Sequence, residues 1–322
     1  MSASGANGWA AWPGRALRAG WSAIPEPTRA RVRHPVQRLK LVRSREVAPF
    51  LDFAPPGHYY SPVPSLSELE SRAPAASARG VAEIDLQEES QLALFGELAR
   101  LAGAERLPRR PEPGRRYVVV DDEYFGEADA TLYLALLRHL RPRRVVEVGS
   151  GYSSALLLDV ADAELPGLEA TFIEPYPDRL LPLLRPSDAD AVRIIRRPVQ
   201  DVPLDVFAAL EPGDVLFVDS THVAKYGSDV CHIFAEALPA LADGVVIHLH
   251  DVFWPFEYPV EWLRRGRAWN EAYMVRAFLQ DNARYRILFF EDWFVRRHPD
   301  LVHARMPALR EPNSGSLWLV KG

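Results

Sequence analysis

The sequence predicts a doubly wound α/β fold with a mostly parallel seven-stranded sheet, preceded by a helical or irregular N-terminal cap. From residue 144 onward, short apolar, β-branched runs alternate with helical patterns. Nearly continuous apolar strands separated by helices are typical of a parallel sheet covered on both faces. The first 80 residues differ, because proline and arginine interrupt them so often that no long helical period survives.

Seven segments are predicted as strands. Helical segments follow the first five, which indicates parallel pairing. The last two leave little room for a helix between them, which favours an antiparallel pair. The seven are residues 145–148, 170–174, 192–195, 215–218, 244–249, 285–290 and 316–320, and residues 117–120 are a further candidate for a short strand.

Helical spacing of apolar residues predicts the helices. Asp85 and Glu88 resemble a capping box at the start of one helix. Pro142 ends another. The predicted helices are residues 85–101, 127–140, 153–163, 177–185, 203–209, 227–241 and about 268–281.

The charge distribution separates an N-terminal arm from the rest of the 322 residues. Residues 1–45 hold nine Arg or Lys and one acid, Glu26, whereas the remainder holds 29 basic and 42 acidic residues. We expect a basic, flexible arm at 1–45, a cap region at 46–126 and the main domain at 127–322. The arm is a solvated tail or a contact for lipid, RNA or an acidic partner. The acidic main part argues against a nucleic-acid substrate.

The location predicted from the sequence is cytoplasmic. The single cysteine, Cys231, allows no internal disulfide bond. The N-terminus lacks the apolar stretch of a secretory signal, and no apolar run approaches the roughly 18 residues of a membrane span. We therefore expect no transmembrane segment.

A glycine turn follows the first strand, at Gly149-Ser150-Gly151. Such a turn is weak evidence alone, because nicotinamide and flavin enzymes use it too. The dinucleotide fingerprint would need Gly or Ala at position 154, where this chain has serine. Glu147 is an unusual residue to bury in a strand, and either contacts a ligand or pairs with Arg143 or Arg144.

Acidic and amide side chains follow the second and third strands. Glu174 can accept hydrogen bonds from ribose hydroxyls, although it could also cap a helix that begins at Pro175. Gln200 or Asp201 could receive the amino group of adenine, although Asp201 is also a good N-cap for the helix at 203–209.

Four segments together resemble bacterial class I methyltransferases of the methyltransferase 24 type. The resemblance extends from about Pro56 to the C-terminus and implies a Rossmann-like fold, S-adenosylmethionine as cofactor and methyl transfer, but no particular substrate. The family's third glycine is Ser153 here, whose backbone N–H at a helix start still allows binding. The four segments are EVGSGYSS at 147–154, FIEPYP at 172–177, FVDSTH at 217–222 and VIHLHD at 246–251.

This resemblance assigns the cofactor site to the carboxyl ends of the strands. An acid at the position of Glu147 lies near the methionine ammonium group in such enzymes, where opposite charge offsets its burial. The expected cofactor-binding residues are Glu147, Gly149, Ser150, Gly151, Tyr152, Ser153, Glu174, Gln200, Asp201 and Asp219.

Histidine and aspartate gather where the fourth and fifth strands end. We expect Asp219, His222, His250 and Asp251 to be the catalytic residues. A hydroxyl acceptor must lose its proton, either to a histidine base or with the help of a divalent cation. Asp219, His222 and Asp251 are candidate ligands for Mg²⁺.

Other interpretations of these residues stay open. Related metal-dependent O-methyltransferases add an Asn or a second acid beside the later aspartate, where this chain has Val252. His222 could instead cap the helix at 227–241 or pack against Asp219, and His250 could make a satisfied polar contact.

Aromatic residues near this edge predict a wall for the substrate. We assign Tyr59, Tyr60 and Trp254 to the substrate site and expect Trp262 and Trp269 to pack the core. Lys225 contacts the cofactor or substrate, or is solvated.

The leading hypothesis is an O-methyltransferase for a hydroxyl of a small metabolite or glycan. The alternatives are an N-methyltransferase acting on an amine or peptide, an NAD-dependent oxidoreductase, and a non-catalytic partner protein. Ser154 and Glu147 disfavour the oxidoreductase, and the intact acids disfavour a decayed site. A homo-oligomer is left open.

Overall fold

The computed structural model describes residues 48–77, 81, 83–103, 107–119, 124–310 and 314–322. The chain divides into two compact units, residues 1–69 and 70–322, which we describe separately. The predicted arm at 1–45 lies outside the described residues. Residues 70–126 belong to the same unit as the sheet. The sequence-based division at 126 stays a prediction.

The first unit contains helix α3 (Ala48–Phe53) and the beginning of α4 (Leu66–Ser77). Ser65 caps α4, because its hydroxyl accepts from the Glu68 backbone N–H at 3.2 Å while the Glu68 carboxylate accepts from the Ser65 backbone N–H at 2.8 Å. Tyr59 and Tyr60 are exposed, with ring centroids 4.3 Å apart. Their assignment to the substrate site therefore stays a prediction.

The second unit contains a seven-stranded sheet with the strand order β3-β2-β1-β4-β5-β7-β6. The pairs from β3 to β5 are parallel, and β7 is antiparallel to both β5 and β6. The predicted doubly wound, mostly parallel seven-stranded sheet is confirmed. The strands are β1 (Arg144–Val148), β2 (Glu169–Ile173), β3 (Val192–Ile195), β4 (Val215–Val218), β5 (Val246–His250), β6 (Tyr285–Phe290) and β7 (Ser316–Lys321).

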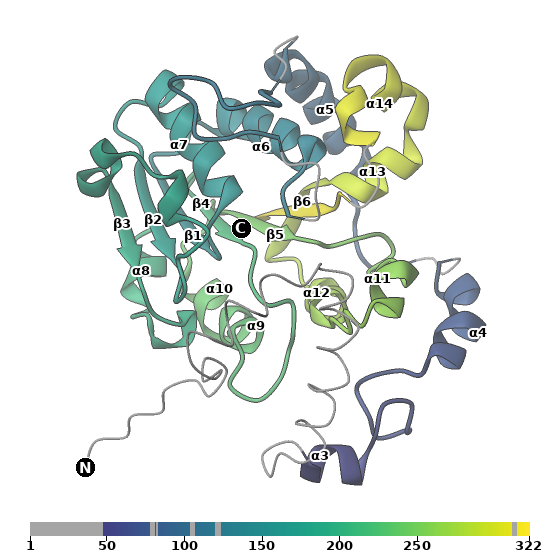
Figure 1. Cartoon of the computed structure of the whole chain (residues 1–322). Coiled ribbons are helices and arrows are strands. Elements are labelled where there is room, and N and C mark those ends of the chain that lie inside the picture. The colour runs from purple at the N-terminus through teal and green to yellow at the C-terminus, as the bar shows by residue number, and fades with distance from the viewer. Residues whose placement is uncertain (1–47, 78–80, 82, 104–106, 120–123, 311–313) are drawn as a thin grey trace, which may run out of the picture. The chain divides into compact units, whose positions relative to one another are not determined.

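Helices cover both faces of this sheet. Figure 1 shows α6 and α7 on one face and α8, α10 and α12 on the other. The α-helices of this unit are α5 (Glu88–Ala102), α6 (Glu127–Leu140), α7 (Tyr152–Glu164), α8 (Asp205–Ala208), α9 (Asp229–His232), α10 (Leu238–Ala240), α11 (Val260–Arg264), α12 (Glu271–Leu279), α13 (Glu291–Arg297) and α14 (Pro299–Arg305). A π-helical segment, η4 (Ile233–Ala237), joins α9 to α10, and the 3₁₀ turns are η1 (Leu181–Leu183), η2 (Pro186–Asp190), η3 (Val199–Asp201) and η5 (Pro307–Arg310). Within the described residues, no helix combines the length and the apolar character that crossing a membrane requires.

The predicted helix at 177–185 is wrong. This segment forms only turns and η1, with η2 following it. Pro177, Pro182 and Pro186 each lack a backbone N–H, so an α-helical hydrogen-bond ladder cannot run through the segment.

Three other predictions about elements were also wrong. Residues 117–119 form no strand, and residue 120 lies outside the described residues. Helix α5 begins at Glu88 after Gln87, whose φ is +54°, so Asp85 is not its cap. Helices α13 and α14 do lie between β6 and β7, although the predicted antiparallel pairing is correct.

A row of four side chains crosses the middle of the sheet beneath α6. The strand register aligns Glu147, Phe217, His248 and Trp318 on four neighbouring strands. The ring of Tyr133 from α6 lies 4.9 Å from that of Phe217 and 5.9 Å from that of Trp318. Burial holds the pKa of His248 well below its usual value, so this histidine is a neutral core residue.

A buried ion network ties the segment before α6 to α7. The Arg116 guanidinium lies 3.0 Å from Asp159 and 2.5 Å from Asp188, and all three side chains are buried. The Asp159 carboxylate also accepts the backbone N–H groups of Arg116 and Tyr117 at 2.9 Å. Since α7 begins directly after the glycine turn, this network helps to fix the turn in place.

Replacing the central arginine should destabilise the protein strongly. We expect Arg116→Met to lower the free energy of unfolding by about 3–5 kcal/mol, because the buried carboxylates lose their nearest counter-charge and keep only Arg185, 3.4 Å from Asp159. The matched control is Arg143→Met, whose partner Glu211 is exposed (side chains 71% and 58% exposed). It should cost at most about 1 kcal/mol. Urea denaturation measures both, and equal losses would contradict a stabilising role for the network.

Candidate functional site

The glycine turn after β1 packs directly against the end of β4. Gly149 has a φ of +81°, and a Cβ atom there would lie 1.7 Å from the Asp219 carbonyl oxygen. The Asp219 N–H donates to the Val148 carbonyl at 2.9 Å, and the Gly149 N–H donates to the Ile173 carbonyl at 3.1 Å. Only glycine fits this position, and the contact brings three strand ends together.

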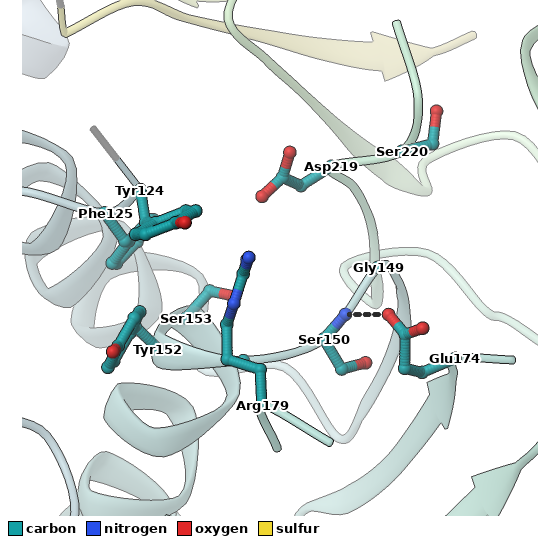
Figure 2. A pocket seen from close by; sticks show the side chains of 11 residues that line it. Tyr124, Phe125, Gly149, Ser150, Tyr152, Ser153, Glu174, Arg179, Asp219 and Ser220 are labelled. Atoms are coloured by element: carbon teal, nitrogen blue, oxygen red, sulfur yellow. Dashed lines mark hydrogen bonds between the residues drawn. The ribbon is translucent and has the colours of Figure 1, made fainter. Parts of the chain in front are cut away.

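Glu174 faces the turn, as the sequence predicted. Its carboxylate accepts the Ser150 N–H at 3.2 Å (Figure 2). It also accepts the Tyr176 N–H at 2.9 Å. No α-helix begins at Pro175, so the capping interpretation is wrong. A cavity of about 200 Å³ lies between these groups, lined by Tyr124, Phe125, Gly149, Ser150, Gly151, Tyr152, Ser153, Glu174, Arg179, Asp219 and Ser220.

Glu147 lies beneath this cavity and is completely buried. The hydroxyl of Ser153 donates to one carboxylate oxygen, while the other has no partner among the described residues. Burial raises the pKa of Glu147 from about 4.5 to about 8, although hydrogen bonds from Ser153 and Ser154 oppose the rise.

The replacement of the family's third glycine by serine now has a physical reason. Ser153 supplies a hydrogen bond to the buried carboxyl group of Glu147, which pairs with neither Arg143 nor Arg144. These arginines contact Glu211 and Glu169 instead, so the ion-pair interpretation of Glu147 is wrong. Glu147 is not among the residues that line the cavity, and it contacts them through Ser153.

The two candidates for adenine recognition lie outside the cavity lining. Gln200 donates its side-chain N–H to the Gly227 carbonyl at 2.8 Å, and Asp201 is exposed at the end of η3. Leu204, not Asp201, occupies the N-cap position of α8. The adenine roles of Gln200 and Asp201 stay predictions.

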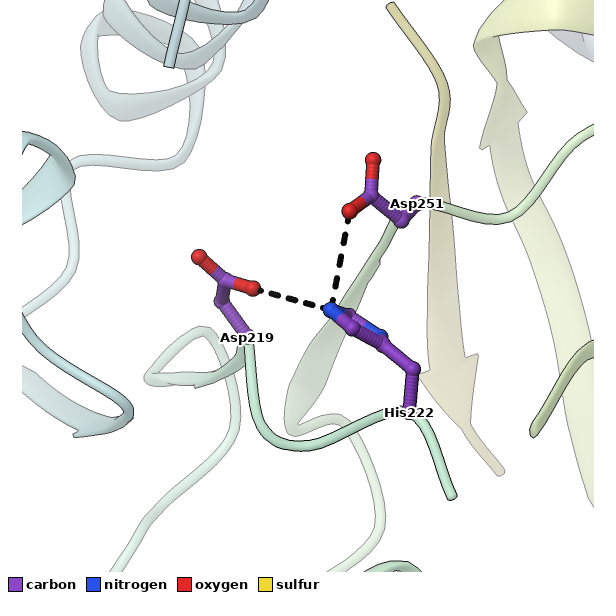
Figure 3. Close-up of side chains that lie close together, drawn as sticks. All are labelled: Asp219, His222 and Asp251. Atoms are coloured by element: carbon purple, nitrogen blue, oxygen red, sulfur yellow. Dashed lines mark ion pairs between the residues drawn. The ribbon is translucent and has the colours of Figure 1, made fainter. Parts of the chain in front are cut away.

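The structure brings the predicted His/Asp cluster together. His222 Nε2 lies 3.2 Å from Asp219 Oδ1 and 3.5 Å from Asp251 Oδ2 (Figure 3). His222 Nδ1 lies 2.8 Å from Glu271 Oε2, a contact that sequence reasoning missed. The histidine is buried, whereas the side chains of Asp219 and Asp251 are 30% and 14% exposed. The ring therefore presents Nε2 to two carboxylates at a partly open edge.

Backbone contacts fix this histidine. Its carbonyl accepts the N–H groups of Asn270 and Glu271, both at 3.1 Å, and the Asn270 side-chain oxygen accepts the Ala224 N–H at 2.6 Å. The loop after β4 is thus held by the beginning of α12. Ser228 caps α9 through its hydroxyl, so His222 is not the cap of this helix.

The electrostatics of the cluster favour a positive charge between the carboxylates. Burial alone would lower the pKa of His222, but hydrogen bonds to Asp219 and Glu271 raise it well above its usual value. Burial raises the pKa of Asp251 to about 6, while the charges of His250 and His222 oppose that rise.

His250 lies behind this cluster. It is buried, its Nε2 is 3.9 Å from Asp251 Oδ1, and its Nδ1 has no hydrogen-bond partner among the described residues. The ring lies 5.7 Å from that of Phe125. The interpretation of His250 as a satisfied polar contact is therefore wrong for Nδ1, and its catalytic role stays a prediction.

Asp219, His222 and Asp251 have a geometry that suits a divalent cation. One ligand atom from each lies within 4.8 Å of the others. Adjacent ligands of an octahedral site lie about 3 Å apart at metal–oxygen distances near 2.1 Å, so the three ligand atoms, which lie within 4.8 Å of one another, would have to move closer around a bound ion. Glu271 on the other ring nitrogen matches the carboxylate–histidine arrangement that orients metal ligands in proteins.

Trp254 lines a second cavity of about 390 Å³ that follows β5. Its backbone N–H donates to Asp292 at 2.8 Å. Trp262 is buried and its ring lies 5.4 Å from that of Trp269, as expected for packing residues. The lining of the cavity combines aromatic, proline and charged residues: Phe253, Trp254, Pro255, Glu257, Tyr258, Pro259, Val260, Asp292, Val295, Arg296, Leu309, Arg310 and Ser314.

Comparisons with known proteins find a matching protein family and a relative of similar sequence. The model of a family described as a methyltransferase domain, methyltransferase 24, matches residues 146–252. An uncharacterized protein of Archaeoglobus fulgidus is 34% identical over 165 residues, which are 49% of this chain and 73% of that protein.

Two solved structures are similar at lower identity. The methyltransferase PaMTH1 of Podospora anserina, bound to SAH, is 15% identical with a TM-score of 0.38, covering 81% of this chain and 98% of its own. The O-methyltransferase TomG of Streptomyces achromogenes, in complex with SAM, is 18% identical with a TM-score of 0.36, covering 80% and 99%. At these TM-scores neither structure gives evidence about the site of this chain.

The buried carboxyl group of Glu147 should impose a pH dependence on stability. The pKa of Glu147 is higher in the folded protein than in the unfolded chain. Its contribution to the free energy of unfolding is therefore fully present below about pH 4.5 and is lost as the pH rises through about 8. Relative to Glu147→Gln, the wild type should lose a few kcal/mol of unfolding free energy between pH 5 and 9, at about 1.4 kcal/mol per pKa unit.

Urea denaturation at stepped pH measures this difference. The matched control is Glu169→Gln at the start of neighbouring β2, where the side chain is 71% exposed, and its curve should follow that of the wild type. A constant difference between the wild type and Glu147→Gln across this range would refute the assignment of a neutral buried carboxyl group.

Proposed function

We propose that this chain, which belongs to the methyltransferase 24 family and is an S-adenosylmethionine-dependent methyltransferase, transfers the methyl group to a hydroxyl oxygen of a small molecule. The observation that supports an oxygen acceptor is the cluster of Asp219, His222 and Asp251 at the edge of the cofactor cavity. Asp219 belongs to both the cluster and the cavity lining, so we expect the methyl group and the acceptor to meet beside it.

The cavity beside the glycine turn suits S-adenosylmethionine. Glu174 offers carboxylate oxygens to the ribose hydroxyls, and the missing side chains of Gly149 and Gly151 let the ligand approach the backbone. Buried Glu147 keeps one carboxyl oxygen without a partner among the described residues, and a cationic ligand nearby would lower the raised pKa of this group and stabilise its ionised form. The bound cofactor supplies the electrophilic methyl group.

The second task is to activate the acceptor hydroxyl, which we assign to the cluster. We propose that Asp219, His222 and Asp251 hold a divalent cation, which when bound lowers the pKa of the acceptor hydroxyl. Glu271 orients the His222 ring by accepting its Nδ1–H, so that Nε2 faces the two aspartates. Glu271 is in this view a positioning residue.

The donor set bears on which cation binds. Mg²⁺ prefers oxygen ligands, whereas an imidazole nitrogen beside two carboxylates also suits Mn²⁺ and other first-row metals. Mg²⁺ stays a candidate from the sequence, and Mn²⁺ is the better match to the ligands. The aromatic cavity at Trp254 is our proposed site for the acceptor, because its walls suit a ring and its charged rim suits polar substituents.

Other parts of the functional assignment remain predictions from the sequence alone. These are a cytoplasmic location, a glycan as acceptor and a homo-oligomeric state. N-methylation of an amine or peptide is the alternative reaction.

Cation binding tests the cluster without knowledge of the acceptor. Titration of the EDTA-treated protein with Mn²⁺, followed by electron paramagnetic resonance, should detect one bound ion per chain, which Asp251→Asn abolishes. Glu271→Gln should weaken binding about 10- to 100-fold, because a neutral amide oxygen replaces the carboxylate that orients the ring and raises its basicity. The matched control is Glu291→Gln, since Glu291 is equally buried at the start of another helix but bonds to serines. Unchanged Mn²⁺ affinity in Asp251→Asn would reject the metal site.

The identity of the acceptor atom can be tested through His222. Formation of S-adenosylhomocysteine would be assayed with a panel of small phenols, sugars and amines. For a hydroxyl acceptor, His222→Ala should lower kcat about 10²- to 10⁴-fold, because the acceptor hydroxyl then loses the assistance of His222 in giving up its proton. An amine acceptor needs only to lose a proton to solvent, so activity on amines alone, retained in His222→Ala, would instead support N-methylation.

A further inference from the structure

Arg179 crosses the glycine turn and enters the cofactor cavity. A Cβ atom at Gly151 would lie 2.9 Å from its Cδ and 3.4 Å from its Cγ, so the arginine stem occupies the space that the glycine leaves. Its guanidinium carbon lies 4.0 Å from the centre of the Tyr124 ring. Figure 2 shows the side chain rising between Tyr124 and Asp219 toward the open centre of the cavity.

The charge of Arg179 is unusual at this place. Among the described residues that line the cavity, Glu174 and Asp219 are acidic and Arg179 alone is basic. Within the described parts of the chain, no carboxylate lies within the 4.0 Å of an ion pair with it, although its charge acts at longer range on the Asp219 carboxylate, and its guanidinium stacks on the Tyr124 ring. Stacking on an aromatic face leaves the N–H groups at the edge of a guanidinium available for a planar acceptor.

The ligand carries charges of both signs. S-adenosylmethionine has a positive sulfonium, a positive ammonium and a single negative group, the methionine carboxylate. A fixed cation opposes a ligand of net positive charge, and this repulsion becomes attraction where the cation faces the ligand's carboxylate. The fork of guanidinium N–H donors matches a carboxylate in shape and charge.

We propose that Arg179 binds the carboxylate of the methionine moiety, with Tyr124 holding the guanidinium plane and Gly151 leaving room for the stem. This inference rests on the cofactor assignment above. It adds a specificity determinant, because Arg179 would make the enzyme distinguish S-adenosylmethionine from analogues that lack the carboxylate. It also fixes the orientation of the ligand, with its amino-acid end toward Tyr124.

Paired ligands test the proposal without an acceptor. Calorimetric titration would compare S-adenosylmethionine with its decarboxylated form, which keeps the sulfonium and the ammonium. Wild type should prefer the intact cofactor, and Arg179→Gln should lower affinity for it about 10- to 100-fold while changing affinity for the decarboxylated form less than about threefold. The matched control is Arg193→Gln on the exposed side of β3, which should leave both affinities unchanged.

A second variant separates charge from packing. Arg179→Lys keeps the charge and should retain part of the preference for the intact cofactor, whereas Arg179→Gln should lose it. Equal weakening of both ligands in Arg179→Gln would mean that the arginine only packs the cavity, and unchanged affinities would mean that it does not bind the cofactor. Either result overturns the inference while the cofactor assignment stands. A wild type that bound neither ligand would overturn both.

Discussion

The contact between Gly149 and the Asp219 carbonyl is the constraint on which the site depends. No side chain fits between these two backbones, since a Cβ atom would lie 1.7 Å from the oxygen. The turn after β1 and the end of β4 are therefore fixed against one another, with Ser150 and Glu174 on one side and Asp219 on the other. Both the cofactor cavity and the His222 cluster use Asp219, so a shift of this turn would disturb binding and chemistry together.

Much of this architecture could be predicted from the sequence because it follows from local rules. Buried parallel strands read as apolar runs, and residues after parallel strands meet at one edge of the sheet. That rule placed Asp219, His222 and Asp251 together correctly. Local rules failed at residues 177–185, where prolines prevent the helix that the apolar pattern indicated. They also failed between β6 and β7, where the sequence showed no clear periodicity but helices α13 and α14 form.

The rest of the site could not be predicted, because it depends on contacts between segments far apart in sequence. Glu271 is 49 residues from His222, and only the packing of α12 against the loop after β4 joins them. Ser153 departs from the family's turn, and its reason, a hydrogen bond to the buried carboxyl group of Glu147, depends on the fold. The role of Arg179 could not be predicted, since the sequence indicated a helix around it, whereas the segment forms turns and its stem lies over Gly151.

The placement of charged side chains around the cavity favours one orientation of the bound ligand. Arg179 stacks on Tyr124 and its tip points toward Asp219 (Figure 2), and Asp219 leads on to the carboxylates around His222. With its carboxylate held at Arg179 and its ribose at Glu174, the cofactor would turn its sulfonium toward Asp219. Methyl transfer is an in-line displacement, so the acceptor oxygen must approach from beyond the methyl group. That approach lies on the side of Asp219 and Asp251, where the structure gathers the groups able to stabilise an oxyanion through a bound cation.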